Sequence, residues 1–275
     1  KDDLGLYSNT ATVNFSIAPE GVILVTTLSD NLNATDKKVS IREAMLAANN
    51  DSISDVSPKG NGADIIMFDP ALFDGQENTI NLSAMLPIID DVSIIAPTSE
   101  AGTPLLTLNM TSANRHFNIT DDDANVLEVS LQNLKLTNGQ RTGSTNVNGG
   151  SIFNAEHLVL INSELMNNHT VNGYGGAIYN TGTLEISNSF FQNNSSILSS
   201  GGAIASIGGF VTLTNTTLDN NSVEGHGGGL YASNANVSLI NSTLSLNSVS
   251  MGSGGGLYQL NGELTINGSR IVGND

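Results

Sequence analysis

The fold is decided by a segment that reads GGAIYNTGTLEISNSFFQNN at residues 175–194. Its opening Gly-Gly pair recurs along the second half of the chain in steps of 26, 26, 26 and 27 residues. A small residue and then an aliphatic one follow each pair, as Ala177 and Ile178 do here. Constant phase over a period of this length indicates a repeat architecture. The pairs lie at residues 149–150, 175–176, 201–202, 227–228 and 254–255.

Two further blocks keep the same phase within each period. The first alternates apolar and polar residues up to an asparagine, as in residues 184–188 (LEISN), and such alternation is typical of a half-buried strand. The second begins three residues after that asparagine with an apolar residue such as Phe191. Each period therefore contains three short predicted strands separated by turns. Six residues after the first asparagine a second one recurs, as Asn168, Asn194, Asn221, Asn247 and Asn274.

The repeat predicts an all-β fold, a right-handed single-stranded parallel β-helix with three short strands per coil of about 26 residues. A single coil cannot bury its own apolar side, but a stack of coils can, because each strand pairs with its copy one turn away. The recurring Asn168 position then forms an inward ladder of side-chain amides. The Gly pairs suit backbone with positive φ or close approach between coils.

The chain before the repeats divides into three predicted parts. Residues 1–20 resemble the end of a preceding immunoglobulin- or cadherin-like module or a linker, and residues 21–62 hold an N-terminal strand and a helix. Ser40 and Glu43 form a predicted capping box for that helix, whose apolar side would close the first coil as a cap. Residues 63–147 form irregular coils and residues 148–275 the regular ones. We expect the solenoid to be truncated at the C-terminus, with further coils, a cap or another subunit following.

Composition excludes several functions. The 275 residues carry a formal net charge of −17 with only nine Lys and Arg, so the basic surface of a nucleic-acid-binding protein is missing. The longest apolar stretches are a few residues, so we expect no membrane insertion within this segment. There is no cysteine, hence no disulfide and no thiolate metal site. The acidic, cysteine-free composition suits an extracellular or cell-surface protein.

Two parts of the chain are similar to known families. Residues 39–44 (VSIREA) resemble the signature of the CSLREA-type domain, with Val39 and Ile41 in place of its Cys and Leu. The repeats after residue 148 are similar to the polymorphic outer-membrane protein repeat, most closely at residues 175–178 (GGAI) and 191–194 (FQNN). The resemblance implies a large adhesin-like surface protein of bacteria or archaea. It implies no catalytic residue.

Because many parallel β-helices degrade polysaccharides, an enzyme is the main rival hypothesis. A polyuronate lyase needs a basic residue to take a proton, yet no Lys or Arg lies between Gly143 and Ser269. A glycosidase needs two carboxyl groups about 5–10 Å apart. The acids of the regular coils fall at different phases, so no pair is predicted and we expect no catalytic residue. They are Glu156, Glu164, Glu185, Asp219, Glu224 and Glu263.

Two candidate sites remain. The run Asp121, Asp122 and Asp123 could bind calcium, the only cofactor that the sequence suggests, although an exposed turn between strands explains it as well. An aromatic position recurs after the Gly pairs and could stack sugar rings, although a structural ladder of rings is the commoner arrangement. Its members are Phe153, Tyr179, Tyr231 and Tyr258, with Ala205 in the remaining copy.

The sequence thus favours a non-catalytic extracellular repeat protein, an adhesin-like rigid rod whose partners are glycans or proteins of a cell surface or matrix. One alternative is a structural subunit of a filament, sheath or surface layer, with neighbouring subunits stacked on the C-terminal coil. A second alternative is a β-helix that binds or cleaves neutral polysaccharide.

Overall fold

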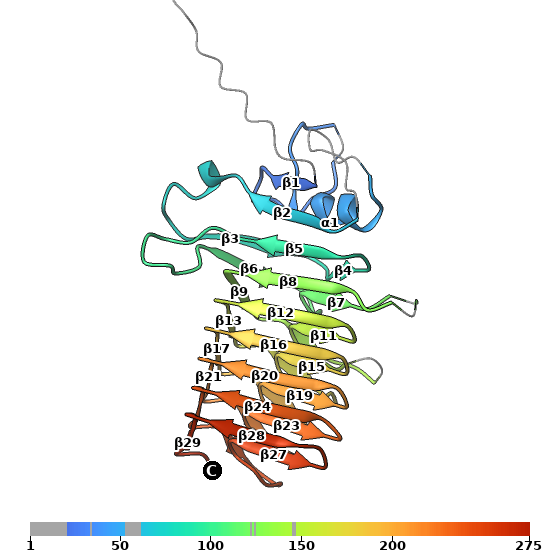
Figure 1. Ribbon diagram of the computed structural model, residues 1–275. Coiled ribbons are helices and arrows are strands. Elements are labelled where there is room, and N and C mark those ends of the chain that lie inside the picture. Colours follow the sequence, from blue (N-terminus) through green and yellow to red (C-terminus); the bar gives the residue numbers. More distant parts are fainter. Residues whose placement is uncertain (1–20, 34, 53–61, 122, 124, 145–146) are drawn as a thin grey trace, which may run out of the picture.

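The computed structural model describes residues 21–275 apart from residues 34, 53–61, 122, 124 and 145–146. The chain winds into a stack of coils, a parallel β-solenoid of about eight turns, with the helix α1 (Ile41–Asn49) at the N-terminal end (Figure 1). Strands of successive coils lie beside one another and form four parallel sheets that run along the stack. The predicted domain boundary at residue 20 lies outside the described residues.

The alternating segments of the repeats form the strands of the longest sheet, sheet 1. The segments that follow them form the second longest, sheet 2. Sheet 1 holds, in order, β1 (Val22–Val25), β2 (Asp64–Phe68), β5 (Val92–Ile95), β8 (Glu128–Gln132), β12 (His157–Ile161), β16 (Thr183–Ser187), β20 (Phe210–Thr214), β24 (Asn236–Ile240) and β28 (Leu264–Asn267). Sheet 2 holds β3 (Asn78–Leu82), β6 (Leu106–Met110), β9 (Leu134–Thr137), β13 (Glu164–Met166), β17 (Phe190–Gln192), β21 (Thr217–Asp219), β25 (Thr243–Ser245) and β29 (Arg270–Val272).

The other two sheets flank the Gly pairs. Sheet 3, which follows the pairs, holds β4 (Leu86–Ile88), β7 (Phe117–Ile119), β11 (Ile152–Asn154), β15 (Ile178–Asn180), β19 (Ile204–Ile207), β23 (Leu230–Ser233) and β27 (Leu257–Leu260). Sheet 4, which precedes them, holds β10 (Gln140–Arg141), β14 (His169–Val171), β18 (Ser195–Ile197), β22 (Ser222–Val223) and β26 (Ser248–Val249).

Sheet 4 corrects the prediction of three strands per coil, since each described regular coil before the last has four. Its strands contain only two or three residues, which is too few for alternation to be visible in the sequence. The connection between Thr137 and the Gly pair at 149–150 is longer than in the later coils, and β10 lies within it. This strand pairs with β14 through Gln140 and His169.

Equivalent residues stack in register, which confirms the predicted solenoid. Ile178 pairs with Ile152 on one side and Ile204 on the other, and all three side chains are fully buried. The alternating segments behave in the same way, because Leu184 and Ile186 point inward while Glu185 between them is exposed. One apolar core therefore runs through the coils, with each coil covering the apolar side of the next.

The predicted asparagine ladder is present and buried. The side-chain oxygen of Asn221 accepts hydrogen bonds from the backbone N–H of Asn194 and from its side-chain amide, both at 2.9 Å. Asn221 in turn donates from its side chain to Asn247 at 2.9 Å and to the backbone carbonyl of Phe191 at 3.1 Å. The same pattern continues to Asn168 and Asn274. The five asparagines thus link consecutive coils by side-chain hydrogen bonds.

The first asparagine of each repeat, which ends the alternating segment, determines a turn of the backbone. Asn188 adopts a φ of 50°, and its equivalents Asn162, Asn215 and Asn241 adopt φ values of 47°, 49° and 50°. The last copy has Gly268, with a φ of 64°. Asparagine and glycine are the residues that adopt left-handed backbone most readily, so this position turns the chain from sheet 1 into sheet 2.

The predicted helix and its capping box are confirmed. The Ser40 side chain accepts from the backbone N–H of Glu43, and the Glu43 carboxylate accepts from the backbone N–H of Ser40. Ile41, Met45 and Ala48 are buried against the first strands, so α1 covers that end of the core. A 3-10 turn, η1 (Pro70–Leu72), follows β2. No described helix is long and apolar enough to cross a bilayer.

Arg42 fastens the cap to the solenoid. Its guanidinium donates to both carboxylate oxygens of Asp30 at 2.9 Å and to the backbone carbonyls of Ala84 and Met85 at 2.7 and 3.0 Å. Asp30 also accepts from the backbone N–H and hydroxyl of Ser83, both at 2.8 Å. The loop before α1 and the turn between β3 and β4 are therefore held together by one cluster of charge-assisted hydrogen bonds.

Replacing Arg42 with glutamine is expected to loosen the cap. The change removes the bidentate pair and leaves Asp30, whose side chain is only 5% exposed, without its cation, at a cost of about 2–3 kcal/mol. Hydrogen exchange of the α1 amides should rise while that of β24 is unchanged. Lys38→Gln, an exposed cation two residues before Ser40, is the control and should leave exchange unaltered. Equal hydrogen exchange of the α1 amides in both variants would contradict this role of Arg42.

Candidate functional site

The predicted aromatic positions form one column on the outer side of sheet 3. Phe153 and Tyr179 are paired in register, as are Tyr231 and Tyr258, and all four rings are half-buried. Ring centroids lie 5.5 Å apart in the first pair and 5.7 Å apart in the second. Ala205 separates the pairs. The alternation of β11 and its equivalents determines this placement, because the residues on either side point into the core.

Sequence reasoning missed two rings that complete the column. Tyr174 lies 6.3 Å from Tyr179 and 6.0 Å from Tyr231, and so bridges the gap at Ala205. His226 stacks on Tyr258 at 4.3 Å. Both come from the position directly before a Gly pair, in the loop between sheets 4 and 3. Tyr174 and His226 occupy the same position of the repeat, which could have revealed them. The other copies of this position are Asn148, Ser200 and Ser253, so no aromatic pattern is visible in the sequence.

The stack has a consequence for sugar binding. Tyr231 and Tyr258 are inclined by only 11°, so each ring covers a face of its neighbour. Stacking on a sugar requires a free ring face, whereas rings inside a stack turn mainly their edges toward solvent. The arrangement therefore stiffens sheet 3 along the axis, and carbohydrate stacking on this stripe stays a prediction.

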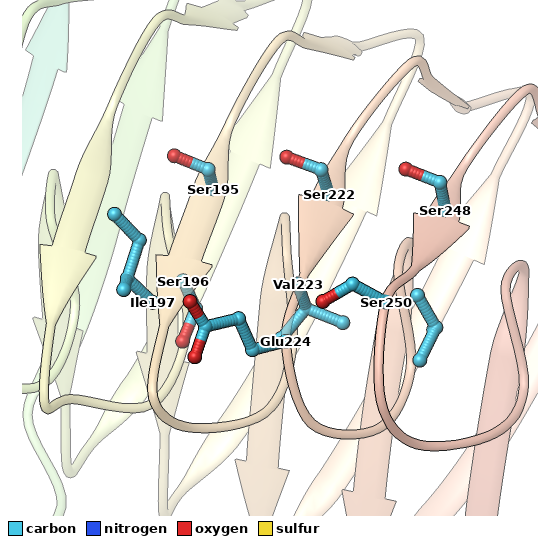
Figure 2. A pocket seen from close by; sticks show the side chains of 9 residues that line it. Ser195, Ser196, Ile197, Ser222, Val223, Glu224, Ser248 and Ser250 are labelled. Atoms are coloured by element: carbon cyan, nitrogen blue, oxygen red, sulfur yellow. The ribbon is translucent and has the colours of Figure 1, made fainter.

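A shallow groove follows the outer side of sheet 4. Figure 2 shows the side chains of Ser195, Ser222 and Ser248 in one row on successive strands. Ile197, the last residue of β18, and Glu224, in the turn that follows β22, line the same groove. The cavity measures about 330 Å³ and carries one carboxylate, whose oxygen accepts from the backbone N–H of Leu198 at 3.2 Å. The groove offers hydroxyls and apolar surface but no cation.

The predicted calcium run is only partly described, since Asp122 lies outside the described residues. The Asp121 carboxylate accepts from the backbone N–H of Asp123 at 3.1 Å, and the Asp123 carboxylate accepts from that of Asn125. These bonds are those of a turn between strands. Within the described part of the chain, no group of three or more His, Asp or Glu side chains could hold a metal ion. Calcium binding stays a prediction.

The acids of the regular coils occupy separate places. Glu185 projects from sheet 1 and lies 3.5 Å from the His157 ring, whereas Asp219 lies on sheet 2 and accepts from Ser245 at 2.7 Å. Glu164 is on sheet 2 as well, but two coils earlier and in the first rather than the third position of its strand. These carboxylates are not paired in register with one another.

His116 and Ser151 form a close pair that is sealed in the core. The Nε2–H of His116 donates to the backbone carbonyls of Leu108 and Thr137 at 3.0 and 3.1 Å, so Nδ1 accepts from the Ser151 hydroxyl at 2.9 Å. Both side chains are fully buried, which leaves no access for a substrate. Burial lowers the pKa of His116 to about 4, so the ring is neutral at physiological pH.

This histidine makes stability depend on pH. The pKa of His116 is lower in the folded chain, about 4, than the ordinary 6.5, so the folded state binds fewer protons between these values. Its contribution is therefore complete above pH 6.5 and is lost as the pH falls to 4, a change of about 3 kcal/mol. Comparing urea unfolding of His116→Gln and the parent chain across this range isolates the effect. His226→Gln is the control. If the free energy of unfolding of the His116→Gln variant changed with pH as steeply as that of the parent chain, His116 would not be the source of the pH dependence.

Comparison with known proteins relates part of the chain to a family of repeats. Residues 215–233 match the family model of the Chlamydia polymorphic membrane protein repeat. The matched segment spans β21, β22 and β23, and contains the ladder residue Asn221 and the Gly pair at 227–228. No curated protein matches the chain. Fold and repeat together define a parallel β-solenoid with repeats similar to those of that membrane protein family, which is consistent with a surface repeat protein.

Proposed function

We propose that the chain is a non-catalytic, adhesin-like surface protein that acts as a rigid extracellular rod. The observation that carries this proposal is the unbroken asparagine ladder from Asn168 to Asn274, which links consecutive coils inside a continuous core. Regular stacking of this kind resists bending and keeps lateral surfaces at fixed positions along the axis. The match to the polymorphic membrane protein repeat supports a place at the cell surface.

A binding role is favoured over catalysis by the placement of reactive groups. The described carboxylates of the regular coils lie at separate places, with Glu185 on sheet 1, Asp219 on sheet 2 and Glu224 beside sheet 4. The buried His116 is neutral and inaccessible. A glycosidase would need two carboxyl groups facing one another across a cleft. The long lateral surfaces of sheets 3 and 4 instead suit a partner that lies along the rod, such as a glycan or protein of a cell surface or matrix.

Residues 39–44, which resemble the CSLREA-type signature, form the start of the N-terminal cap. Ser40 and Glu43 cap α1, Ile41 and Ala44 are buried, and Arg42 clasps the next coil. Each of these residues therefore has a structural task in closing the solenoid. We propose that such a cap begins the rod, and that the signature reports this architecture and carries no chemistry of its own.

A paired binding and turnover experiment tests the proposal. The labelled chain is applied to arrays of glycans and matrix proteins and to cell surfaces, and in parallel is incubated with neutral polysaccharides while new reducing ends are measured. We expect saturable binding with no release of reducing ends. Gly202→Ala, which disturbs the stacking of coils, should lose the binding. Absence of any binding, or steady release of reducing ends, would overturn the proposal.

A further inference from the structure

The tyrosines of this chain are gathered in one place. Four of the five belong to the aromatic column on sheet 3, namely Tyr174, Tyr179, Tyr231 and Tyr258, and the fifth, Tyr7, lies outside the described residues. The sequence contains no tryptophan and no cysteine. Phenol side chains are therefore the groups of this protein that give up a single electron most readily, and the column holds four of them together.

Tyr231 and Tyr258 are the best-matched pair of tyrosines in the column. They are partners in register on the neighbouring parallel strands β23 and β27. Their ring centroids lie 5.7 Å apart and their planes are inclined by 11°, whereas Tyr174 lies 6.0 Å from Tyr231 at 29° and 6.3 Å from Tyr179 at 40°. Parallel strands in register project equivalent side chains in the same direction, so the hydroxyl-bearing ends of Tyr231 and Tyr258 lie side by side.

Neighbouring side chains restrict the rotation of both rings. Tyr174 stacks on Tyr231, and His226 stacks on Tyr258 with ring centroids 4.3 Å apart. His226 is itself anchored, because its Nδ1 atom accepts a hydrogen bond from the backbone N–H of Ser253 at 3.1 Å. Both tyrosines are half-buried, and it is mainly the edges of stacked rings that reach solvent. The edge of a phenol carries its hydroxyl and the two ortho carbons, which are the atoms that react in radical coupling.

Tyr179, at the other end of the column, is less suited to this chemistry. It stacks on Phe153, which has no hydroxyl, and Ala205 takes its position in the next coil. Burial and the nearby Tyr174 raise the pKa of Tyr179, so its phenol gives up a proton less readily than an ordinary tyrosine. Because a phenol loses this proton together with the electron, oxidation is favoured at the end that holds Tyr231 and Tyr258.

We propose that Tyr231 and Tyr258 are a modification site, at which hydrogen peroxide and a haem peroxidase join the two rings as dityrosine. Each phenol gives one electron and its hydroxyl proton to the oxidant and becomes a phenoxyl radical. The two radicals couple through one ortho carbon of each ring, and the hydrogen atoms on those carbons move to the two oxygens. One carbon–carbon bond forms, two hydrogen atoms leave the protein, and one hydrogen peroxide becomes two water molecules.

The bond would connect two consecutive coils covalently. Like a disulfide, it limits the freedom of the unfolded chain between the joined residues, and this chain has no cysteine with which to form a disulfide. The cross-link therefore strengthens the solenoid where peroxide is present. The inference goes beyond the proposed binding function and does not depend on it.

Treatment of the full chain with hydrogen peroxide and a plant haem peroxidase tests the site. We expect dityrosine fluorescence in the monomeric fraction, and a thermolysin product that joins the peptides of Tyr231 and Tyr258 with the loss of two hydrogen atoms. An equal mixture of normal and heavy-isotope chains should give joined peptides of a single isotope type. Absence of dityrosine from the monomer, joined peptides of mixed isotope type, or a bond between other tyrosines overturns the proposal.

Variants that keep a ring at each position locate the reaction. Tyr258→Phe removes one phenol of the pair and should lower the yield of dityrosine at least about fivefold. Tyr179→Phe, at the other end of the column, is the matched control and should leave the yield unchanged. Oxidation should raise the urea midpoint of unfolding in the parent chain and in Tyr179→Phe, but not in Tyr258→Phe. Equal yields in Tyr258→Phe and the parent chain, or an unchanged midpoint after oxidation of the parent chain, overturns the assignment.

Discussion

Replacing Gly202 with alanine is expected to break the solenoid at its centre. An added Cβ would lie 2.1 Å from the backbone oxygen of Gly228 and 2.7 Å from that of Ser222, both in the next coil. Backbone atoms cannot move away without separating the coils, which would open the hydrogen bonds of sheets 3 and 4. We expect a loss of at least about 4 kcal/mol in the free energy of unfolding, an exceptional cost for one methyl group.

Urea denaturation and hydrogen exchange measure this effect. Exchange should increase most at β18, β19, β22 and β23, the strands on either side of the substituted coil. The matched control is Gly208→Ala, where φ is 77° but no atom lies within 4 Å of the added Cβ. That variant should cost only the left-handed strain, about 1–2 kcal/mol. Similar losses in the two variants would show that close approach between coils is not the cause.

Replacing Asn221 with alanine is expected to have the second largest effect. The change leaves the buried backbone N–H of Asn194 and the carbonyl oxygen of Phe191 without their side-chain partners, and cuts the ladder to Asn247. Each buried polar group left unsatisfied costs about 1–3 kcal/mol, so we expect a total loss of about 3–5 kcal/mol.

The control for the ladder lies one residue away. Ser222 is exposed, and Ser222→Ala should change the free energy of unfolding by less than about 0.5 kcal/mol. Asn221→Asp is a second variant of nearly the same shape, in which an acceptor oxygen replaces the amide nitrogen and faces the carbonyl of Phe191 and the side-chain oxygen of Asn247. It should destabilise at least as much as alanine at neutral pH. A stable Asn221→Asp chain would argue against the ladder as the source of stability.

The parts of the fold that repeat could be predicted from the sequence, because a repeated residue implies a repeated environment. The recurrence of Asn168 and its copies predicts one column of side chains, and the structure confirms it. The helix was predictable for a local reason, since Ser40 and Glu43 satisfy each other's backbone groups within one turn. Sheet 4 was not, because Ser222 and Val223 form a strand of two residues that pairs only with other coils.

In the candidate sites, too, only the features that repeat along the chain could be predicted from the sequence. The aromatic position after the Gly pairs was visible as Tyr179 and its copies, but its completion by Tyr174 was not, because that ring comes from a loop of the same coil and reaches across a gap at Ala205. A cavity at the N-terminal end of this column, lined by Arg115, Arg141 and Phe153 among others, left no pattern in the sequence. It arises at the boundary between irregular and regular coils, where the column of rings ends.

The sequence by itself determined that the chain is a parallel solenoid, which residues face its core, and that a capped helix precedes it. Period and alternation are properties of consecutive residues and need no knowledge of what lies beside them. The tertiary structure alone decided which side chains from different coils meet. Arg115 and Arg141 line one cavity, and Asp30 binds Arg42, because winding brings residues a full turn apart to neighbouring positions. Such contacts depend on the pitch and register of the coils, and these become fixed only when the whole core is packed.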